Sequence, residues 1–334
     1  MIKADIVMTL RSPLAHSTPD VQGEGKRGNI TELRKIPFIT SYGELIQLPA
    51  VSGNSIRCSK RRVQGYKMLQ ELNDITLPLD AIYFILAGGT TGNTKAKPVG
   101  QNVYAELRQT LPFIDLFGGS YKGHFLGGRM GVGFGLPVTK ETLPIHSKVM
   151  DKLGLNTDPD VYPDLLSLNE AINNNVIMYA RHALEGTRGL TDETESSASG
   201  QMIYGMQAMP IGTVLISRIV LNEPTASPLT ESCYYAFLST LLDDGFLGAA
   251  FAKGCGEFDA MVLVNGTKTE KDEIRERGLP FWESIQSNKE KIEQTLLGLD
   301  NILQNEPSDT KKNKQNKKNN GTGDDALTES STSQ

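Results

Sequence analysis

The chain has 334 residues, and its 34 Lys and Arg against 39 Asp and Glu give a formal charge of −5. Apolar residues make up 38% of it, which permits a hydrophobic core and excludes a chain that is disordered throughout. The sequence has no apolar run long enough to span a membrane and no apolar signal segment at its N-terminus, so we expect a cytoplasmic protein. Its three cysteines lie far apart and indicate reduced thiols, without a disulfide framework or a zinc site.

The first elements follow from simple patterns. Lys3 to Leu10 alternates and is rich in Ile, Val and Met, which predicts a strand. Residues 11–50 contain many Pro and Gly and predict a long loop, with a short hairpin near residues 38–48. A helix is expected from Gly53 to about Asn73, with Asn54 or Ser55 as its N-cap.

This helix carries an uneven charge. Residues 1–73 hold eleven Lys or Arg and six Asp or Glu, a local charge of +5. At 100° per residue, five polar side chains fall in one sector, and an apolar sector with Ile56, Val63 and Tyr66 lies beside it. The polar sector comprises Arg57, Lys60, Arg61, Gln64 and Lys67. It predicts a grip on a phosphate backbone, although a solvated helix face would give the same pattern.

The rest of the chain mixes helices and strands. We predict helices over 79–87, 103–117, 230–242 and 270–304, and strands over 214–221 and 258–264. The Gly-rich loop at 88–93 lacks the Gly-Lys-Ser/Thr ending of a phosphate-binding P-loop. Residues 127–133 read Gly-x-x-Gly-x-Gly with no helix after them, which argues against a dinucleotide site. The four histidines show no metal spacing, so we expect no cofactor and no metal.

The order of these elements resembles the RAMP superfamily of CRISPR-associated proteins. Within it, the chain is most similar to the backbone subunits that polymerise along a guide RNA in type IV, or in type I-D, effectors. Four segments carry the resemblance: Val51 to Arg57, Leu116-Phe117-Gly118, Ile211-Gly212-Thr213, and Leu247-Gly248 through Gly256.

The resemblance implies an α+β fold with a modified RRM-like, or ferredoxin-like, palm. It also implies the division of the chain. Residues 1–304 would form the backbone subunit, with a finger and web region at about 75–150 and a thumb hairpin at 181–205. Residues 305–334 are polar, with Leu327 as their one large apolar residue, and their composition predicts a disordered tail.

The resemblance implies a non-catalytic, sequence-independent RNA binder. RNA-cutting relatives carry an Asp in a Gly-rich stretch after the first strand, whereas Arg27 to Thr31 here contains none. The expected partners are crRNA, a target DNA or RNA that pairs with it, further copies of the chain arranged head to tail, and other CRISPR effector subunits. An endoribonuclease that processes crRNA or cuts target RNA, and an α/β enzyme for a small ligand, remain as alternatives.

The resemblance and the charge pattern together predict the RNA-binding residues. The first group is Ser52, Asn54, Ser55, Arg57, Lys60 and Arg61. The second group is Arg34, Lys35, Lys122, Arg129, Arg181, Arg188 and Lys253. Met202, Ile203, Tyr204 and Met206 are expected to form an apolar wedge on the thumb against a displaced base, although a core or strand role would suit them as well.

Overall fold

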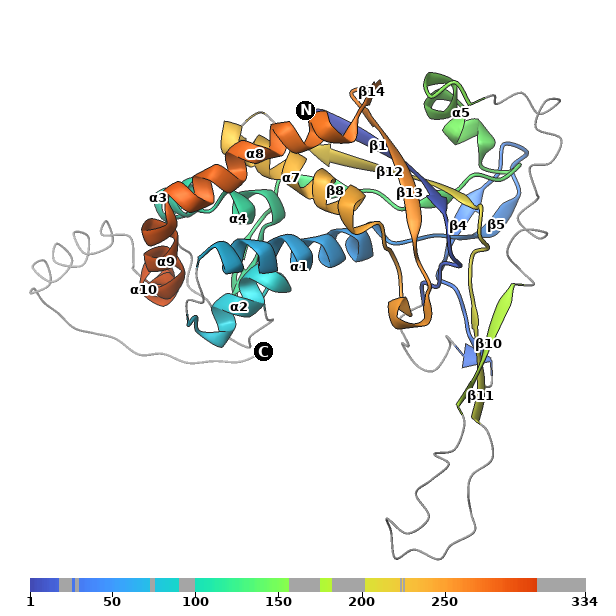
Figure 1. Cartoon of the computed structure of the whole chain (residues 1–334), viewed down its shortest axis with the longest axis horizontal. Coiled ribbons are helices and arrows are strands. Elements are labelled where there is room, and N and C mark those ends of the chain that lie inside the picture. Colours follow the sequence, from blue (N-terminus) through green and yellow to red (C-terminus); the bar gives the residue numbers. More distant parts are fainter. Residues whose placement is uncertain are drawn as a thin grey trace, which may run out of the picture.

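A six-stranded antiparallel sheet forms the centre of the protein in the computed structural model (Figure 1). The structure describes residues 1–17, 26–27, 30–72, 76–89, 100–155, 175–181, 202–222, 224 and 226–304. The sheet has the order β14-β13-β1-β12-β8, and β9 also pairs with β12. Its strands are β1 (Ile2–Leu10), β8 (Met130–Val132), β9 (Leu136–Pro137), β12 (Val214–Leu221), β13 (Phe258–Val264) and β14 (Thr267–Thr269).

Helices cover both faces of this sheet. The helices described are α1 (Gly53–Glu71), α2 (Leu79–Leu86), α3 (Gln101–Thr110), α4 (Pro112–Phe117), α5 (Leu143–Lys152), α7 (Pro228–Asp244), α8 (Lys271–Ser287), α9 (Lys289–Leu297) and α10 (Leu299–Gln304), with a 3-10 turn η1 (Phe251–Lys253). Alternate residues of β1 explain the two layers. Ile6 and Met8 join the large core shared with α1, α7 and α8, whereas Val7 packs in a smaller cluster under α5. Because both faces are covered, β1 is almost wholly buried.

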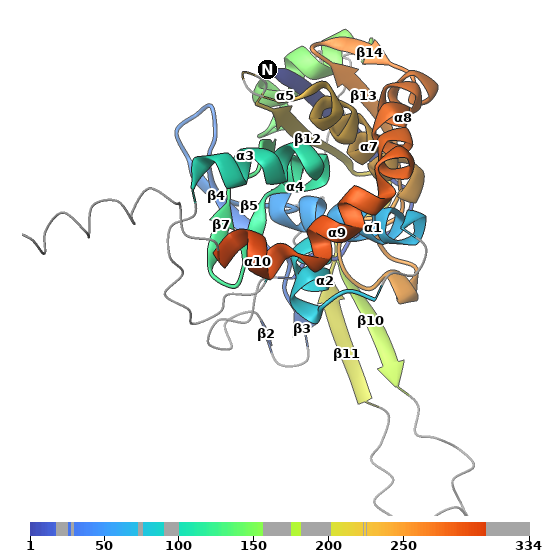
Figure 2. The same cartoon turned by 90° about the vertical axis from the view of Figure 1, so that its left-hand side faces the viewer.

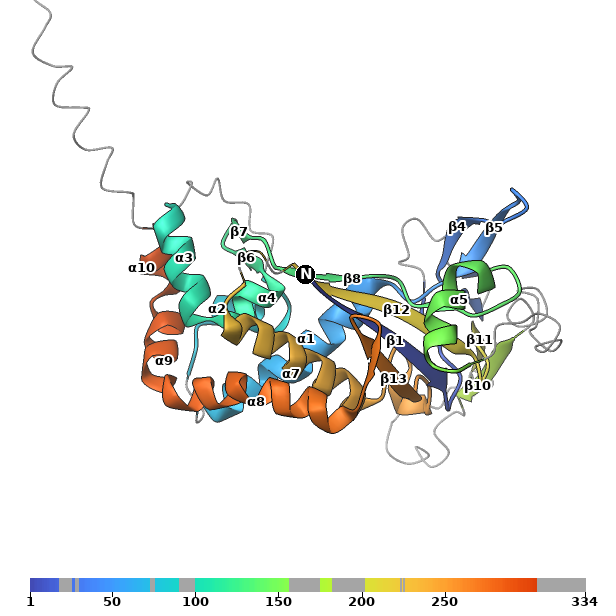
Figure 3. The same ribbon diagram turned by 90° about the horizontal axis from the view of Figure 1, so that it is seen from above.

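Smaller strands extend from this body. They are β2 (Lys26–Arg27), β3 (Ile30–Thr31), β4 (Lys35–Ile39), β5 (Leu45–Pro49), β6 (Gly119–Tyr121), β7 (His124–Leu126), β10 (Val176–Arg181) and β11 (Met202–Gln207). In Figures 1 and 3, helices α3, α9 and α10 lie at one end of the molecule and the hairpins β4–β5 and β10–β11 at the other. Figure 2 shows β2 and β3 beside the β10–β11 pair, with which they form a four-stranded sheet.

Several elements predicted from the sequence are present in the structure. The strand expected at 3–10 is β1, those at 214–221 and 258–264 are β12 and β13, and the hairpin near 38–48 is β4–β5. Two expected helices are divided. The stretch 103–117 breaks at Leu111, because Pro112 restricts the residue before it, and 270–304 forms α8, α9 and α10 with breaks at Asn288 and Gly298.

None of the helices described is both long and apolar enough to cross a bilayer. The tail at 305–334 and most of the thumb expected at 181–205 lie outside the described residues.

The α5 layer holds a buried histidine, His146, which is 5% exposed. Burial lowers its pKa from 6.5 to about 4, and the charge of Asp5 on β1 opposes that shift only in part. Its Nε2 atom is buried without a hydrogen-bond partner in the part of the chain that the structure describes. The imidazole is therefore neutral in the folded protein at neutral pH.

We predict that His146 makes the fold acid-sensitive. Between pH 6.5 and about 4 the unfolded chain binds a proton at this residue that the folded chain does not, so the free energy of unfolding falls as the pH is lowered. The full effect is about 3 kcal/mol. Urea unfolding across this pH range should show a smaller loss of stability in His146→Leu than in the wild type. Parallel pH profiles for the two proteins would contradict the prediction.

Candidate nucleic-acid interface

The start of α1 is anchored inside the protein. Ser52 caps the helix, since its Oγ accepts a hydrogen bond from the Ser55 backbone N–H at 3.2 Å. The backbone N–H of Ser52 donates to Nε2 of His16 at 3.1 Å. Burial and the nearby charge of Arg34 lower the pKa of His16, which favours the neutral imidazole that this bond requires. The cap is therefore Ser52, two or three residues earlier than the sequence predicted.

Lys60 is fully buried on the next turns of α1. Its ammonium group donates to the carboxylate of Asp244, at the end of α7, and to the backbone oxygen of Phe246 at 2.6 Å. Burial lowers the pKa of Lys60, and the hydrogen bond and charge of Asp244 oppose that shift. A buried ammonium needs such partners because losing its hydration costs several kcal/mol.

Arg61 is also buried, with 2% of its surface exposed. Its Nε donates to the backbone oxygen of Ile85 at 2.7 Å, Nη1 donates to that of Gly118 at 2.7 Å, and Nη2 donates to that of Phe84. Phe84 and Ile85 lie in the last turn of α2, where carbonyl groups lack helical partners. Arg61 thus closes the end of α2 from a neighbouring helix.

These contacts revise the predicted phosphate grip. Lys60 and Arg61 lie inside the protein and bind its own carbonyl and carboxylate oxygens, so we remove both from the RNA surface. Arg57 is half-buried and donates to the backbone oxygen of Phe117. The predicted apolar sector is only partly right: Ile56 is buried as expected, whereas Val63 and Tyr66 are 42% and 54% exposed. A helical wheel gives the sectors of a helix but not which sector the distant parts of the chain will cover.

The β10–β11 hairpin extends from the body of the protein (Figure 1). Its register places Tyr179 opposite Tyr204, and the two rings stack with centroids 5.6 Å apart and planes 23° from parallel. Alternate residues of a strand point to opposite faces. Tyr204 and Met206 therefore share one face, and Ile203 lies on the other. The four residues expected to form one wedge are divided between two faces, and Met202 is described only as a strand residue.

Lys253, on η1, reaches the tyrosine face of this hairpin. Its Nζ lies 4.5 Å from the ring centroid of Tyr179 and 4.4 Å from that of Tyr204, and it donates to the Tyr204 hydroxyl at 2.7 Å. Its loop approaches the chain closely at Gly256, where φ is +94° and a Cβ atom would collide with the backbone oxygen of Leu247. The arrangement brings one exposed cation and two aromatic rings together from segments distant in sequence.

The remaining predicted residues are scattered. Lys122 is paired with Asp300 at 2.7 Å and with Asp80 at 3.5 Å, and Arg129 is paired with Asp115 at 2.7 Å. Arg34 and Lys35 are half-buried at the start of β4, Asn54 is exposed on α1, and Ser55 is half-buried there. Arg181 is described only as the last residue of β10, and Arg188 lies outside the described residues. Of the predicted side chains, the structure brings Lys253 and Tyr204 into direct contact.

Sequence reasoning missed two residues of the hairpin. Tyr179 forms half of the ring stack, and Met178, 56% exposed, lies on the opposite face with Ile203. The signal was present in the continuous apolar run from Val176 to Ala180, which is typical of a strand.

Comparison with known proteins identifies the fold. No protein-family model matches this sequence, and no curated protein matches it. Among solved structures, a chain of a type IV-B CRISPR complex matches at a TM-score of 0.50 and 21% identity, over 78% of this chain and 90% of that one. The protein has the fold of that chain. The expected α+β fold is thereby confirmed. Csc2 of Thermofilum pendens covers 96% of this chain and 90% of its own, but at a TM-score of 0.36 and 14% identity it supports no argument.

We predict that the buried hydrogen bonds of Arg61 stabilise the folded protein. Arg61→Met would leave three buried carbonyl oxygens without their donors, and we expect the free energy of unfolding to fall by about 3 kcal/mol or more. Arg62→Ala is the matched control, because Arg62 is exposed on the same helix and its loss should change the value by less than about 0.5 kcal/mol. Urea unfolding measures both. Equal stabilities of the two variants would show that the buried contacts of Arg61 do not support the fold.

Proposed function

We propose that the protein is a non-catalytic backbone subunit of a CRISPR ribonucleoprotein complex and binds crRNA without reading its sequence. The match of fold to a chain of a type IV-B CRISPR complex supports this class of function. The observation that carries the proposal is the extended β10–β11 hairpin with Lys253 placed over its two stacked tyrosines. Copies of the chain would follow one another along the RNA, and its partners would include other subunits of the complex.

The chemistry of this cluster suits single-stranded RNA. Every base has an aromatic face, so stacking on tyrosine is favourable whatever the sequence. Lys253 is exposed and supplies positive charge for a phosphate beside the rings. A phenol is neutral at neutral pH and does not repel the backbone, and a hydrogen bond to Cys255 and burial raise the pKa of Tyr179 further, to about 12.

Neighbouring strands extend this surface. β11 pairs in parallel with β3, and β3 pairs with β2, so the sheet continues beyond the hairpin. This segment adjoins the stretch in which RNA-cutting relatives carry an Asp, and none is present here. We assign the face with Tyr204 to base stacking, because both tyrosine rings and Lys253 lie there. The opposite face, with Met178 and Ile203 exposed, is assigned to the apolar wedge.

A binding experiment tests this assignment. We predict that Tyr204→Ala weakens binding of a fixed-length single-stranded RNA by about tenfold, because stacking of one base contributes about 1–3 kcal/mol. Lys253→Gln should lower the slope of log Kd against log salt by about 0.7, the share of one phosphate contact. Fluorescence anisotropy over a range of salt concentrations measures both, and Tyr204→Phe, which keeps the ring, should retain most of the affinity.

The matched control is Lys268→Gln. Lys268 is an exposed lysine on β14, at the top of the view in Figure 1, whereas β10–β11 extends downward. Its loss should change neither the affinity nor the salt slope beyond a small uniform effect. Wild-type affinity in Tyr204→Ala and in Lys253→Gln would remove the hairpin from the interface. Tenfold different affinities for two RNAs of equal length would contradict sequence-independent binding, and cleavage products would favour the endoribonuclease alternative.

A further inference from the structure

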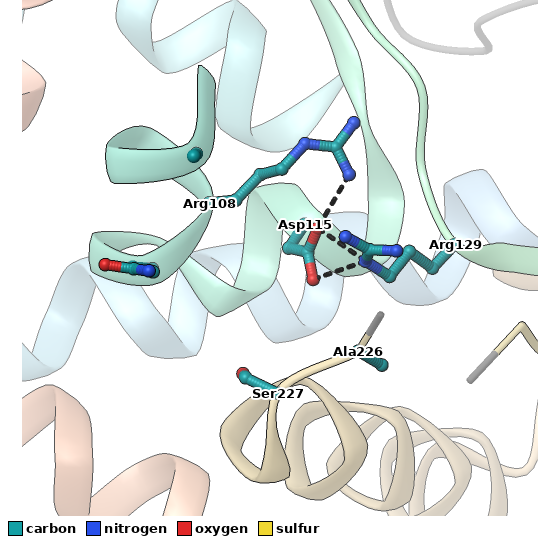
Figure 4. Close-up of a pocket in the computed structure, with 7 residues that line it drawn as sticks. Arg108, Asp115, Arg129, Ala226 and Ser227 are labelled. Atoms are coloured by element: carbon teal, nitrogen blue, oxygen red, sulfur yellow. Dashed lines mark hydrogen bonds and ion pairs between the residues drawn. The ribbon is translucent and has the colours of Figure 1, made fainter. Parts of the chain in front are cut away.

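A cavity of about 340 Å³ opens between α3, α4 and the start of α7 (Figure 4). It is lined by two arginines, Arg108 and Arg129, and by the polar side chains of Gln109 and Ser227. Asp115, from α4, lies between the two guanidinium groups. In Figures 1 and 3, α3 and α4 lie far from the β10–β11 hairpin, so this cavity is separate from the proposed RNA surface.

Asp115 holds the two arginines in place. Its carboxylate is 3% exposed and accepts from Arg108 Nη1 at 2.8 Å, from Arg129 Nε at 2.7 Å, and from the Thr230 hydroxyl at 2.8 Å. A buried carboxylate with these donors is satisfied and rigid, and it neutralises one of the two positive charges beside it. The carboxylate therefore orients the guanidinium groups. The two arginines and Asp115 together carry a net charge of +1.

Arg108 keeps donors for a ligand. Its Nη1 donates to Asp115 and its Nη2 to the backbone oxygen of Gly127 at 2.9 Å. These are its side-chain hydrogen bonds within the described residues, and a guanidinium has five N–H groups. Arg108 is half-buried beside the cavity, so it is fixed by protein contacts on one edge and accessible on another.

The third wall adds a weaker attraction for anions. Ser227 caps the seventeen-residue helix α7, and its Oγ accepts from the Thr230 backbone N–H at 3.1 Å. The positive end of this helix faces the same region as the two guanidinium groups, and Glu231 in its first turn offsets part of that field. The arginines, rather than the helix end, are the main source of positive charge.

We propose that this cavity binds a phosphate group carried by a nucleotide or by a polynucleotide. The donors that Arg108 keeps match the oxygens of a phosphate, and Arg129 adds positive charge beside them. The volume is larger than a phosphate alone needs and lies at the lower end of the range of small-ligand sites, about 300–1,000 Å³. Ala105 and Ala226 keep the remaining walls small, which leaves room for the group that carries the phosphate. This proposal does not depend on binding of crRNA at the hairpin.

Calorimetry with defined probes tests the site. The probes are inorganic phosphate, a nucleoside 5′-monophosphate, and one short oligonucleotide with either a 5′-phosphate or a 5′-hydroxyl end. We expect the wild type to bind at least one of them, and Arg108→Gln to weaken that binding by about tenfold or more. Binding of the free mononucleotide would assign a small ligand, and binding of the phosphorylated oligonucleotide alone would assign a chain end. If the wild type binds both oligonucleotides and Arg108→Gln loses affinity for both, the cavity binds an internal phosphate of the chain.

Two further variants separate the cavity from the stability of the fold. Ala105→Trp fills an exposed position that lines the cavity and leaves the Asp115 contacts intact, so it should block the nucleotide while the protein stays folded. Asn102→Trp places the same side chain at an exposed position of α3 that does not line the cavity, and it should bind like the wild type. Absence of binding to every probe, unchanged affinity in both Arg108→Gln and Ala105→Trp, or equal affinity for acetate would overturn the proposal.

Discussion

The burial of two cations on α1 is the constraint on which the arrangement of the helices depends. A guanidinium or ammonium group removed from water must find oxygen acceptors, or the fold loses several kcal/mol. Arg61 finds them at the end of α2 and at Gly118, and Lys60 finds them at the end of α7. Burial and the neighbouring Arg57 lower the pKa of Arg61 to about 9, which still leaves it protonated at neutral pH. One helix thus fixes the ends of two others, and the core forms around these contacts.

The same residues show which features of the fold could be predicted from the sequence and which could not. Strands β1, β12 and β13 were predictable because their apolar patterns are local and strong, and α1 was predictable as a helix for the same reason. Its orientation was not predictable. The groups that bind Lys60 and Arg61 lie between 23 and 186 residues away in the chain, and nothing in residues 53–71 specifies them. A cationic sector that resembles a phosphate grip and a cationic sector buried against carbonyl groups have the same periodicity.

The hairpin presents the opposite case. The apolar run within Val176–Arg181 was visible in the sequence, but the role of its side chains depended on the pairing with β11, which sets Tyr179 against Tyr204. That pairing also decides which face each side chain occupies, because a shift of one residue would exchange the two faces. Lys253 belongs to the predicted set, yet it enters the cluster from a loop 49 residues beyond Tyr204. Residue types were therefore predictable here, and their juxtaposition required the tertiary structure.

The distribution of cations explains how an acidic chain can still bind a polyanion. With a formal charge of −5, the protein as a whole repels nucleic acid at long range, so any attraction must be local. Many of its cations are unsuited to that role, since Lys60 and Arg61 are buried and Lys122 is held by Asp300. Lys253 differs, because its contacts within the described part of the chain are with neutral aromatic rings rather than carboxylates. At such a site, stacking and charge act on the same short segment of a strand, and affinity depends on contact geometry more than on net charge.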